Sequence, residues 1–232
     1  MTPIDLMRRR TAPLRLVIFD CDGVLVDSEP VSNRILADDL SARGWRMDTA
    51  EATRRFVGTT LHDMRPIIEA QLGQALPATW MQQVTARIVA ALAQEATAIP
   101  GAVETLHAIS ALGVPWRVAS NSSHPEMVAK FARIGIADLV GDRVHSFTDV
   151  AAGKPAPDLF LAAAMAEGVA AHDCLVVEDS VPGVRAAMAA RMDCLGFAPH
   201  SDGASLRAVG AVPFRTMAEL PDLIQAARYR AA

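Results

Sequence analysis

Short, mostly apolar segments recur along this chain, and three of the four end at polar residues. Their length and their branched side chains predict buried strands at residues 14–19, 114–119, 174–177 and 194–197. Between them, apolar positions with helical spacing predict helices at residues 103–112, 125–134, 157–167 and 181–190. Strands that alternate with helices indicate a parallel sheet with helices on both faces, so we expect an α/β, Rossmann-like fold.

One long stretch, between residues 30 and 98, breaks this alternation. It shows helical patterns but no convincing strand, and the helices are predicted at residues 31–42, 61–72 and 79–96. Turn-forming residues at its two ends, Asp27-Ser28-Glu29-Pro30 and Ile99-Pro100-Gly101, suit a pair of hinge linkers. We therefore expect a helical cap domain, residues 30–98, inserted into a core domain of residues 1–29 and 99–232.

The beginning of the chain gives no such pattern. Residues 1–12 lack apolar periodicity, so we predict a loose tail there.

Composition and charge argue against several classes of protein. With 232 residues, 51% of them hydrophobic, the chain can bury one substantial core together with a small accessory domain. Its net charge of −4, with both signs interspersed, lacks the basic stripe of a nucleic-acid-binding protein. No apolar run reaches the roughly 18–20 residues of a membrane span, and the three cysteines have no zinc-site spacing. We expect a cytoplasmic monomer or small homo-oligomer that contacts neither nucleic acid nor a membrane.

Polar residues directly follow three of the predicted strands. Asp20, Asp22 and Gly23 follow the first, Ser120-Asn121 the second and Glu178-Asp179 the third. Ligands of such folds bind beyond the carboxyl ends of the strands, so these residues should meet at one site. Two carboxylates so close together are costly unless a cation or a reaction needs them. Taken alone, the pair is equally compatible with a surface turn.

The segment Asp20-Cys21-Asp22-Gly23-Val24-Leu25-Val26-Asp27-Ser28-Glu29 resembles the first signature of the haloacid dehalogenase superfamily. The other three signatures are resembled, in the expected order, by Ser120-Asn121, by Lys154 in Gly153-Lys154-Pro155, and by Glu178-Asp179. With the predicted strand before the first motif and with Gly183 after the fourth, they span residues 14–183. Four ordered motifs are much harder to produce by chance than one.

The resemblance implies chemical roles that these residue types can perform. Asp20 would be the nucleophile that forms an aspartyl-phosphate, and Asp22 would serve first as general acid and then as general base. Lys154 would balance the charge of Asp20 and of the transferring phosphoryl group. Most lysines are instead solvated surface charges.

Phosphate binding and metal binding are implied by the same motifs. Phosphate or substrate would contact Gly23, Ser120, Asn121 and Lys154. Mg²⁺ would be held by Asp20, by the main-chain carbonyl of Asp22, and by Asp179, with Glu178 as a further or supporting ligand. As alternatives, Ser120 could be a plain helix N-cap, and the Glu178-Asp179 pair could cap the helix that begins near Pro182.

Comparison with two other kinds of enzyme in the superfamily narrows the expected reaction. Dehalogenases of the superfamily lack the second aspartate of the first signature, so Asp22 favours phosphoryl transfer. Sugar phosphomutases of the β-phosphoglucomutase type share the cap but typically have histidine where Ser32 stands and arginine where Leu61 follows Gly58-Thr59-Thr60. We therefore expect water, rather than a sugar hydroxyl, to accept the phosphoryl group.

The expected function is a Mg²⁺-dependent phosphatase of a small-molecule phosphate ester. The first candidate is 6-phosphogluconate, within a class of sugar phosphates and phosphorylated sugar acids. A phosphomutase is the alternative enzyme, and a catalytically idle phosphate-binding protein is the alternative of another class. The cap residues that are candidates for substrate contact are His62, Arg54, Arg55 and Arg65.

Overall fold

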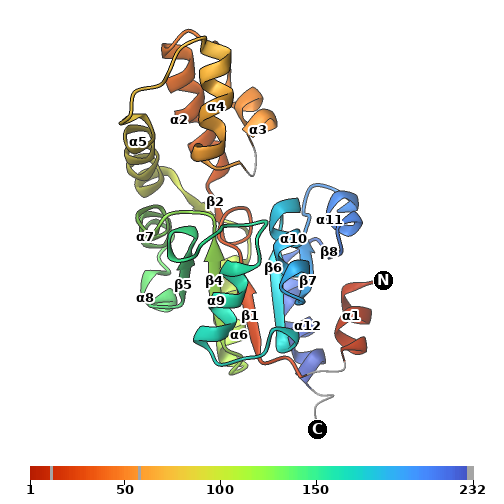
Figure 1. Ribbon diagram of the computed structural model, residues 1–232. Helices are drawn as coiled ribbons and strands as arrows, with labels where there is room; N and C mark the ends of the chain where they lie inside the picture. The colour runs from red at the N-terminus through yellow and green to blue at the C-terminus, as the bar shows by residue number, and fades with distance from the viewer. Residues whose placement is uncertain (11–12, 57–58, 229–232) are drawn as a thin grey trace.

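The computed structural model describes residues 1–10, 13–56 and 59–228 (Figure 1). Within these residues a sheet of six parallel strands has the order β5-β4-β1-β6-β7-β8. The strands are β1 (Leu16–Phe19), β4 (Trp116–Ser120), β5 (Val144–Ser146), β6 (Cys174–Glu178), β7 (Asp193–Phe197) and β8 (Val212–Phe214). The four predicted strands are present as β1, β4, β6 and β7, whereas β5 and β8 at the two edges were not predicted.

Helices cover both faces of this sheet, and the side chains of β1 alternate between the two layers. Val17 and Phe19 pack in one apolar core with α6 (Ala102–Ala111) and α12 (Leu220–Arg228). Leu16 and Ile18 pack in the other core with α9 (Asp158–Ala166) and α10 (Val181–Ala189). Further helices of this part are α7 (His124–Arg133), α8 (Ala137–Val140) and α11 (Ala204–Ala208). The predicted Rossmann-like α/β fold is confirmed.

Four helices lie together beyond the carboxyl edge of the sheet (Figure 1). They are α2 (Glu29–Ala42), α3 (Thr49–Phe56), α4 (Leu61–Leu72) and α5 (Trp80–Glu95). Their two connections to the rest of the chain pair as antiparallel strands, β2 (Val26–Asp27) with β3 (Thr97–Ala98). Helix α5 also packs against α7 of the core layer. The division into a core and a cap domain with the boundaries given above stays a prediction.

The amino terminus differs from the prediction. Residues Pro3–Arg9 form helix α1, whose first turn is closed by reciprocal hydrogen bonds between Thr2 and Asp5. Met7 is 1% exposed, and the helix packs against α12. For residues 3–9 the predicted loose tail is therefore wrong, because a capped helix that buries one large apolar side chain needs no longer apolar repeat. Residues 11–12 of that prediction lie outside the described residues. None of the helices in the described residues has the length and the apolar character of a membrane span.

Candidate active site

The polar residues that follow the central strands meet at one edge of the sheet. Asp20 directly follows β1, Ser120 ends β4, and Glu178 ends β6. These three strands are neighbours in register, since Phe19 pairs with Val118 on one side and with Val177 on the other. The fold thus gathers side chains that are more than 150 residues apart in the sequence.

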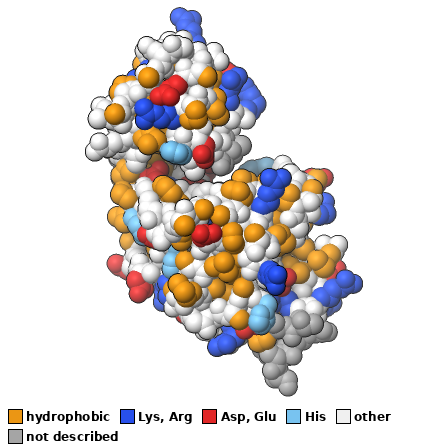
Figure 2. Space-filling view, in the orientation of Figure 1, with side chains coloured by type: hydrophobic (Ala, Val, Ile, Leu, Met, Phe, Trp, Pro, Cys, Tyr) orange, Lys and Arg blue, Asp and Glu red, His pale blue; other side chains and the backbone are white. Residues whose placement is uncertain are grey.

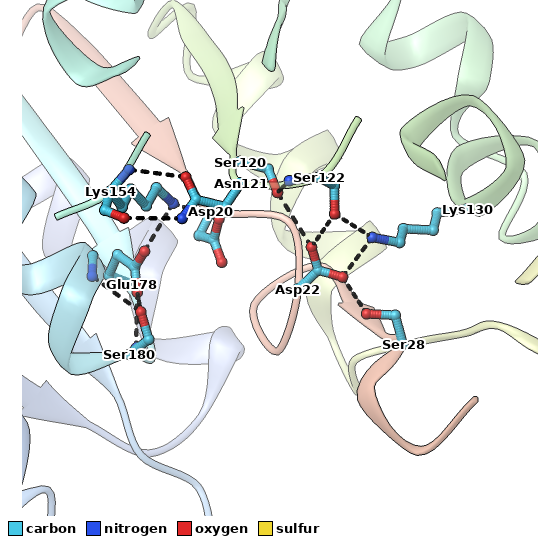
Figure 3. Close-up of polar contacts among 11 residues, drawn as sticks. Asp20, Asp22, Ser28, Ser120, Asn121, Ser122, Lys130, Lys154, Glu178 and Ser180 are labelled. Atoms are coloured by element: carbon cyan, nitrogen blue, oxygen red, sulfur yellow. Dashed lines mark hydrogen bonds and ion pairs between the residues drawn. The ribbon is translucent and has the colours of Figure 1, made fainter. Parts of the chain in front are cut away.

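A buried ion pair lies at the centre of this cluster. The Lys154 ammonium is 2.5 Å from Asp20 Oδ1 and 2.8 Å from Glu178 Oε1, and each of the three side chains is nearly inaccessible (Figure 3). Burial raises the pKa of Asp20 to about 7; the Lys154 charge opposes this rise, whereas Glu178 and Asp22 add to it. Although burial would lower it, the pKa of Lys154 is raised by the carboxylates of Asp20 and Glu178. The lysine is therefore a fixed cation beside Asp20.

The same cluster has the donor chemistry of a divalent-cation site. Carboxylate oxygens of Asp20, Glu178 and Asp179 all lie within 4.8 Å of one another. Burial, and then the charges of Glu178 and Asp20, hold the pKa of Asp179 well above its usual range. Lys154 alone does not neutralise three crowded carboxylates, and hard oxygen ligands of this kind suit a small divalent cation.

The three carboxylates are not equivalent. No donor among the described residues bonds to the Asp179 carboxylate, whereas Glu178 accepts from Lys154, from the Ser180 N–H at 2.8 Å and from the Ser180 hydroxyl at 2.9 Å. Because Glu178 already accepts hydrogen bonds from Lys154 and Ser180, it is best suited to orient these neighbours. The Asp179 oxygens are better suited to bind a cation. Gly23, at φ +73°, allows this approach, because a Cβ there would lie 2.0 Å from Asp179 Oδ2.

Asp22 lies in a separate group of polar side chains and points away from Asp20 (Figure 3). Its Oδ1 accepts from the Lys130 ammonium at 2.5 Å and from the Ser28 hydroxyl. Its Oδ2 accepts from the hydroxyls of Ser122 at 2.7 Å and Ser120 at 3.2 Å. Burial would raise the pKa of Asp22, but Lys130 and these hydrogen bonds outweigh it and lower the pKa to about 2. In this position Asp22 is a carboxylate at neutral pH.

Sequence reasoning missed Lys130 and Ser122. Neither belongs to a signature, and Lys130 is separated from Asp22 by 108 residues. One signal was present in the sequence: Lys130 falls between Met127 and Phe131 on the apolar face of its helix. A lysine in such a position has to find a buried partner.

Two predicted phosphate-binding residues have other partners. Ser120 is not a helix N-cap, because Ser123 precedes α7 and its N–H and hydroxyl both donate to Glu126. The Asn121 amide pairs with the Lys154 main chain, at 3.1 Å to its oxygen and 2.9 Å from its N–H. Asn121 thus holds the main chain of Lys154 in place. The predicted contact of Asn121 with substrate, like the other predicted roles, stays a prediction.

A cavity of about 840 Å³ opens over these groups. Asp20, Asp22, Ser120 and Lys154 line its floor, and α2, α3, α4 and α5 contribute its opposite wall. Figure 2 shows a constriction between the two lobes of the molecule at this level.

Six positions singled out in the cap region divide into two groups. His62, Ser32 and Leu61 line the cavity, whereas Arg54, Arg55 and Arg65 are not among its described lining residues. Arg55 and Arg65 instead pair with glutamates of their own helices. Gly58, which precedes Leu61 in the comparison with the mutases, lies outside the described residues.

Known proteins resemble this chain over most of its length. The family model described as "haloacid dehalogenase-like hydrolase" matches residues 14–191. A 6-phosphogluconate phosphatase of Escherichia coli (strain K12) is 31% identical, over 92% of this chain and 96% of its own. Hexitol phosphatase A of the same organism is 31% identical, over 84% of this chain and 88% of its own.

A solved structure shows the same fold. The crystal structure of a hydrolase from Deinococcus radiodurans R1, with bound phosphate and sodium, is 34% identical with a TM-score of 0.75. It covers 93% of this chain and 97% of its own. This chain therefore belongs to the haloacid dehalogenase-like hydrolases, and it is an enzyme of the phosphatase type that its relatives represent.

Proposed function

We propose that this protein is a Mg²⁺-dependent phosphatase that hydrolyses a small phosphomonoester through a phosphoryl group carried on Asp20. The observation that carries the proposal is the pairing of Asp20 with the buried Lys154 ammonium at 2.5 Å, on the floor of the cavity. A carboxylate held beside a fixed cation, and beside a second carboxylate without a donor, suits attack on a phosphate dianion.

The reaction has two half-reactions. Asp22 first takes up a proton from solvent, because it is a carboxylate at neutral pH. In the first half-reaction, an oxygen of Asp20 then bonds to phosphorus while the ester oxygen leaves as an alcohol with that proton. In the second, water gives a proton to Asp22, and its oxygen bonds to phosphorus, releasing phosphate and regenerating the Asp20 carboxylate. Lys154 offsets the negative charge at Asp20 in both.

A divalent cation would be held by Asp20, Asp179 and the main-chain carbonyl of Asp22. When bound, it would reduce the repulsion between the nucleophile and the phosphate. Glu178 supports this arrangement by fixing Lys154.

The side chains of the cavity wall opposite Asp20 indicate which class of phosphate ester would fit. The two lysines on the described lining, Lys130 and Lys154, are each paired with an aspartate, and the cap side offers only His62 as a basic group. Apart from the Glu29 carboxylate at the start of α2, the rest of the lining on this side is apolar or carries neutral hydroxyl and amide groups: Ser32, Asn33, Leu36, Phe56, Thr59, Thr60, Leu61, Met64, Met81, Thr85 and Ile88. A substrate carboxylate against this wall would lose hydration without gaining a strong cation.

The wall therefore supports an uncharged sugar or sugar-alcohol phosphate, such as hexitol phosphatase A acts on by its name. Sequence similarity to the 6-phosphogluconate phosphatase of Escherichia coli supports 6-phosphogluconate as the substrate, and this stays the prediction from the sequence. The two substrates should be compared in the same assay, because only 6-phosphogluconate carries a carboxylate that this wall would disfavour.

The test is phosphate release from p-nitrophenyl phosphate, sorbitol 6-phosphate and 6-phosphogluconate, with and without Mg²⁺, by wild type and by Asp20→Asn. We expect Mg²⁺-dependent release that the substitution abolishes, with sorbitol 6-phosphate preferred over the sugar acid. Isomerised sugar phosphate without release would identify a mutase. Tight phosphate binding without turnover of any ester would indicate a binding protein instead.

A further inference from the structure

Lys130 is a buried lysine that belongs to no signature of the sequence. Its side chain is 2% exposed, and its ammonium lies 2.5 Å from Asp22 Oδ1 and 2.7 Å from Ser122 Oγ. The Ser122 hydroxyl donates to the other oxygen of Asp22 at 2.7 Å. Ammonium, hydroxyl and carboxylate thus form a closed triangle in which each group contacts the other two (Figure 3).

Stability alone does not account for this lysine. Removing an ammonium and a carboxylate from water is costly, and apolar side chains of similar size in place of a buried ion pair are often neutral or stabilising. Met127 and Phe131, its neighbours on the same helix, are buried apolar residues. An apolar residue would suit this helix face, so the position that Lys130 gives to Asp22 is the property to explain.

The contacts of Asp22 define one orientation. Each of its two oxygens accepts from two donors, and Lys130 is the only charged one among them. The Asp22 side chain nevertheless keeps 29% exposure and lines the cavity. Lys154, the other buried lysine, pairs with Asp20 and Glu178 in a separate group. The two lysines therefore hold the two aspartates apart, with Asp22 accessible from the cavity.

We propose that Lys130 is the positioning residue of Asp22, which it orients for proton exchange with the leaving alcohol and with the attacking water. This inference rests on the proposed function, because Asp22 needs a fixed orientation only if it gives a proton to the ester oxygen and takes one from water. Without the Lys130 ammonium, three neutral hydroxyls would hold the carboxylate, and its orientation would be less defined.

Lys130→Met tests the proposal, because methionine fills a similar volume without the charge. The readout is kcat/KM for two esters, since this ratio reports only the first half-reaction. The p-nitrophenolate of p-nitrophenyl phosphate leaves without a proton, whereas the alcohol of sorbitol 6-phosphate needs one. We expect kcat/KM for sorbitol 6-phosphate to fall by about 100-fold and that for p-nitrophenyl phosphate by less than about 10-fold.

A second variant covers the case in which Lys130→Met fails to fold. Ser122→Ala removes the hydroxyl that contacts both Lys130 and Asp22, and we expect the same selective loss at a smaller size. Equal losses for the two esters, or no loss for either, in the folded variants would overturn the positioning role. Wild type that releases no phosphate from either ester would overturn the proposed function, and the Lys130 proposal with it. Wild-type release that depends on Asp20, with an unchanged ratio in the variants, would overturn the Lys130 proposal alone.

Discussion

Replacing Gly183 by alanine tests whether the site depends on the position of the Glu178 carboxylate. Gly183 lies in the first turn of α10, in a backbone conformation that alanine adopts readily. A Cβ at this position would lie 1.6 Å from Glu178 Oε1 and 2.4 Å from Oε2. Because Cβ atoms do not approach other atoms below 3.0 Å, the carboxylate would have to retreat by about 1.4 Å or more.

The magnitude follows from what this retreat breaks. Glu178 is fully buried and accepts from Lys154 at 2.8 Å and from the Ser180 N–H at 2.8 Å. A displacement of this size at Oε1 takes the Lys154 distance beyond a hydrogen bond, and breaking a buried charged pair costs about 3–5 kcal/mol. Alanine in place of glycine stabilises a helix by about 1 kcal/mol. The clash outweighs the helix propensity, so the free energy of unfolding should fall by about 3 kcal/mol.

Activity should fall as well, because Lys154 would lose one of its two carboxylate partners. Loss of such an orienting partner lowers activity by about 10- to 100-fold. Urea unfolding and turnover of p-nitrophenyl phosphate measure the two effects on the same sample.

Ala189→Gly is the matched control, since Ala189 is exposed on the same helix. It should lower the free energy of unfolding by less than about 1 kcal/mol, because Ala189 is the last residue of the helix, and leave turnover unchanged. A Gly183→Ala variant that is more stable than wild type and retains full turnover would refute the reasoning, because helix propensity would then be the only effect present.

Two further substitutions test the metal site and the amino-terminal helix. Asp179→Asn should raise the Mg²⁺ concentration for half-maximal turnover by about 10-fold or more. The pKa of Asp179 is raised on folding, so ionisation of its carboxyl group opposes folding. Metal-free wild type should therefore become more stable as the pH falls from neutral, and Asp179→Asn should lack part of this gain. Thermal unfolding in EDTA at several pH values measures the difference, and equal pH responses of the two proteins would contradict the prediction. Met7→Ala should lower the free energy of unfolding by about 3 kcal/mol, because the side chain is 1% exposed, whereas Met1→Ala, at a residue 66% exposed, should leave it within about 0.5 kcal/mol. Equally small effects of both methionine substitutions in urea unfolding would favour the loose tail that the sequence predicts.

Local sequence determined the central strands and the residues at their ends. The segment that contains β1 is apolar and branched at nearly every position, so it reads as a strand buried on both faces without help from its neighbours. Asp20 and Glu178 follow their strands directly, and parallel neighbours bring strand ends together. The strand ends could therefore be located before any tertiary contact was known, and the resemblance to the haloacid dehalogenase signatures named the candidate nucleophile, its lysine and the acidic pair.

Short elements depended on contacts distant in the sequence. β5 and β8 have three residues each, too few for a periodic pattern, and their pairing with β4 and β7 makes them strands. Helix α1 is likewise defined by its contact with α12.

The surroundings of Asp22 were decided by tertiary structure alone. The sequence placed Asp22 beside Asp20 in one motif, yet its carboxylate is paired with Lys130, 108 residues further along the chain. A motif fixes which residues are close to each other along the backbone, whereas side-chain direction and charge partner depend on what packs against them. The sequence thus determined which chemical groups this enzyme has. Only the packing of α7 against the loop after β1 decided that Asp22 is held by Lys130, whereas Asp20 is held by Lys154.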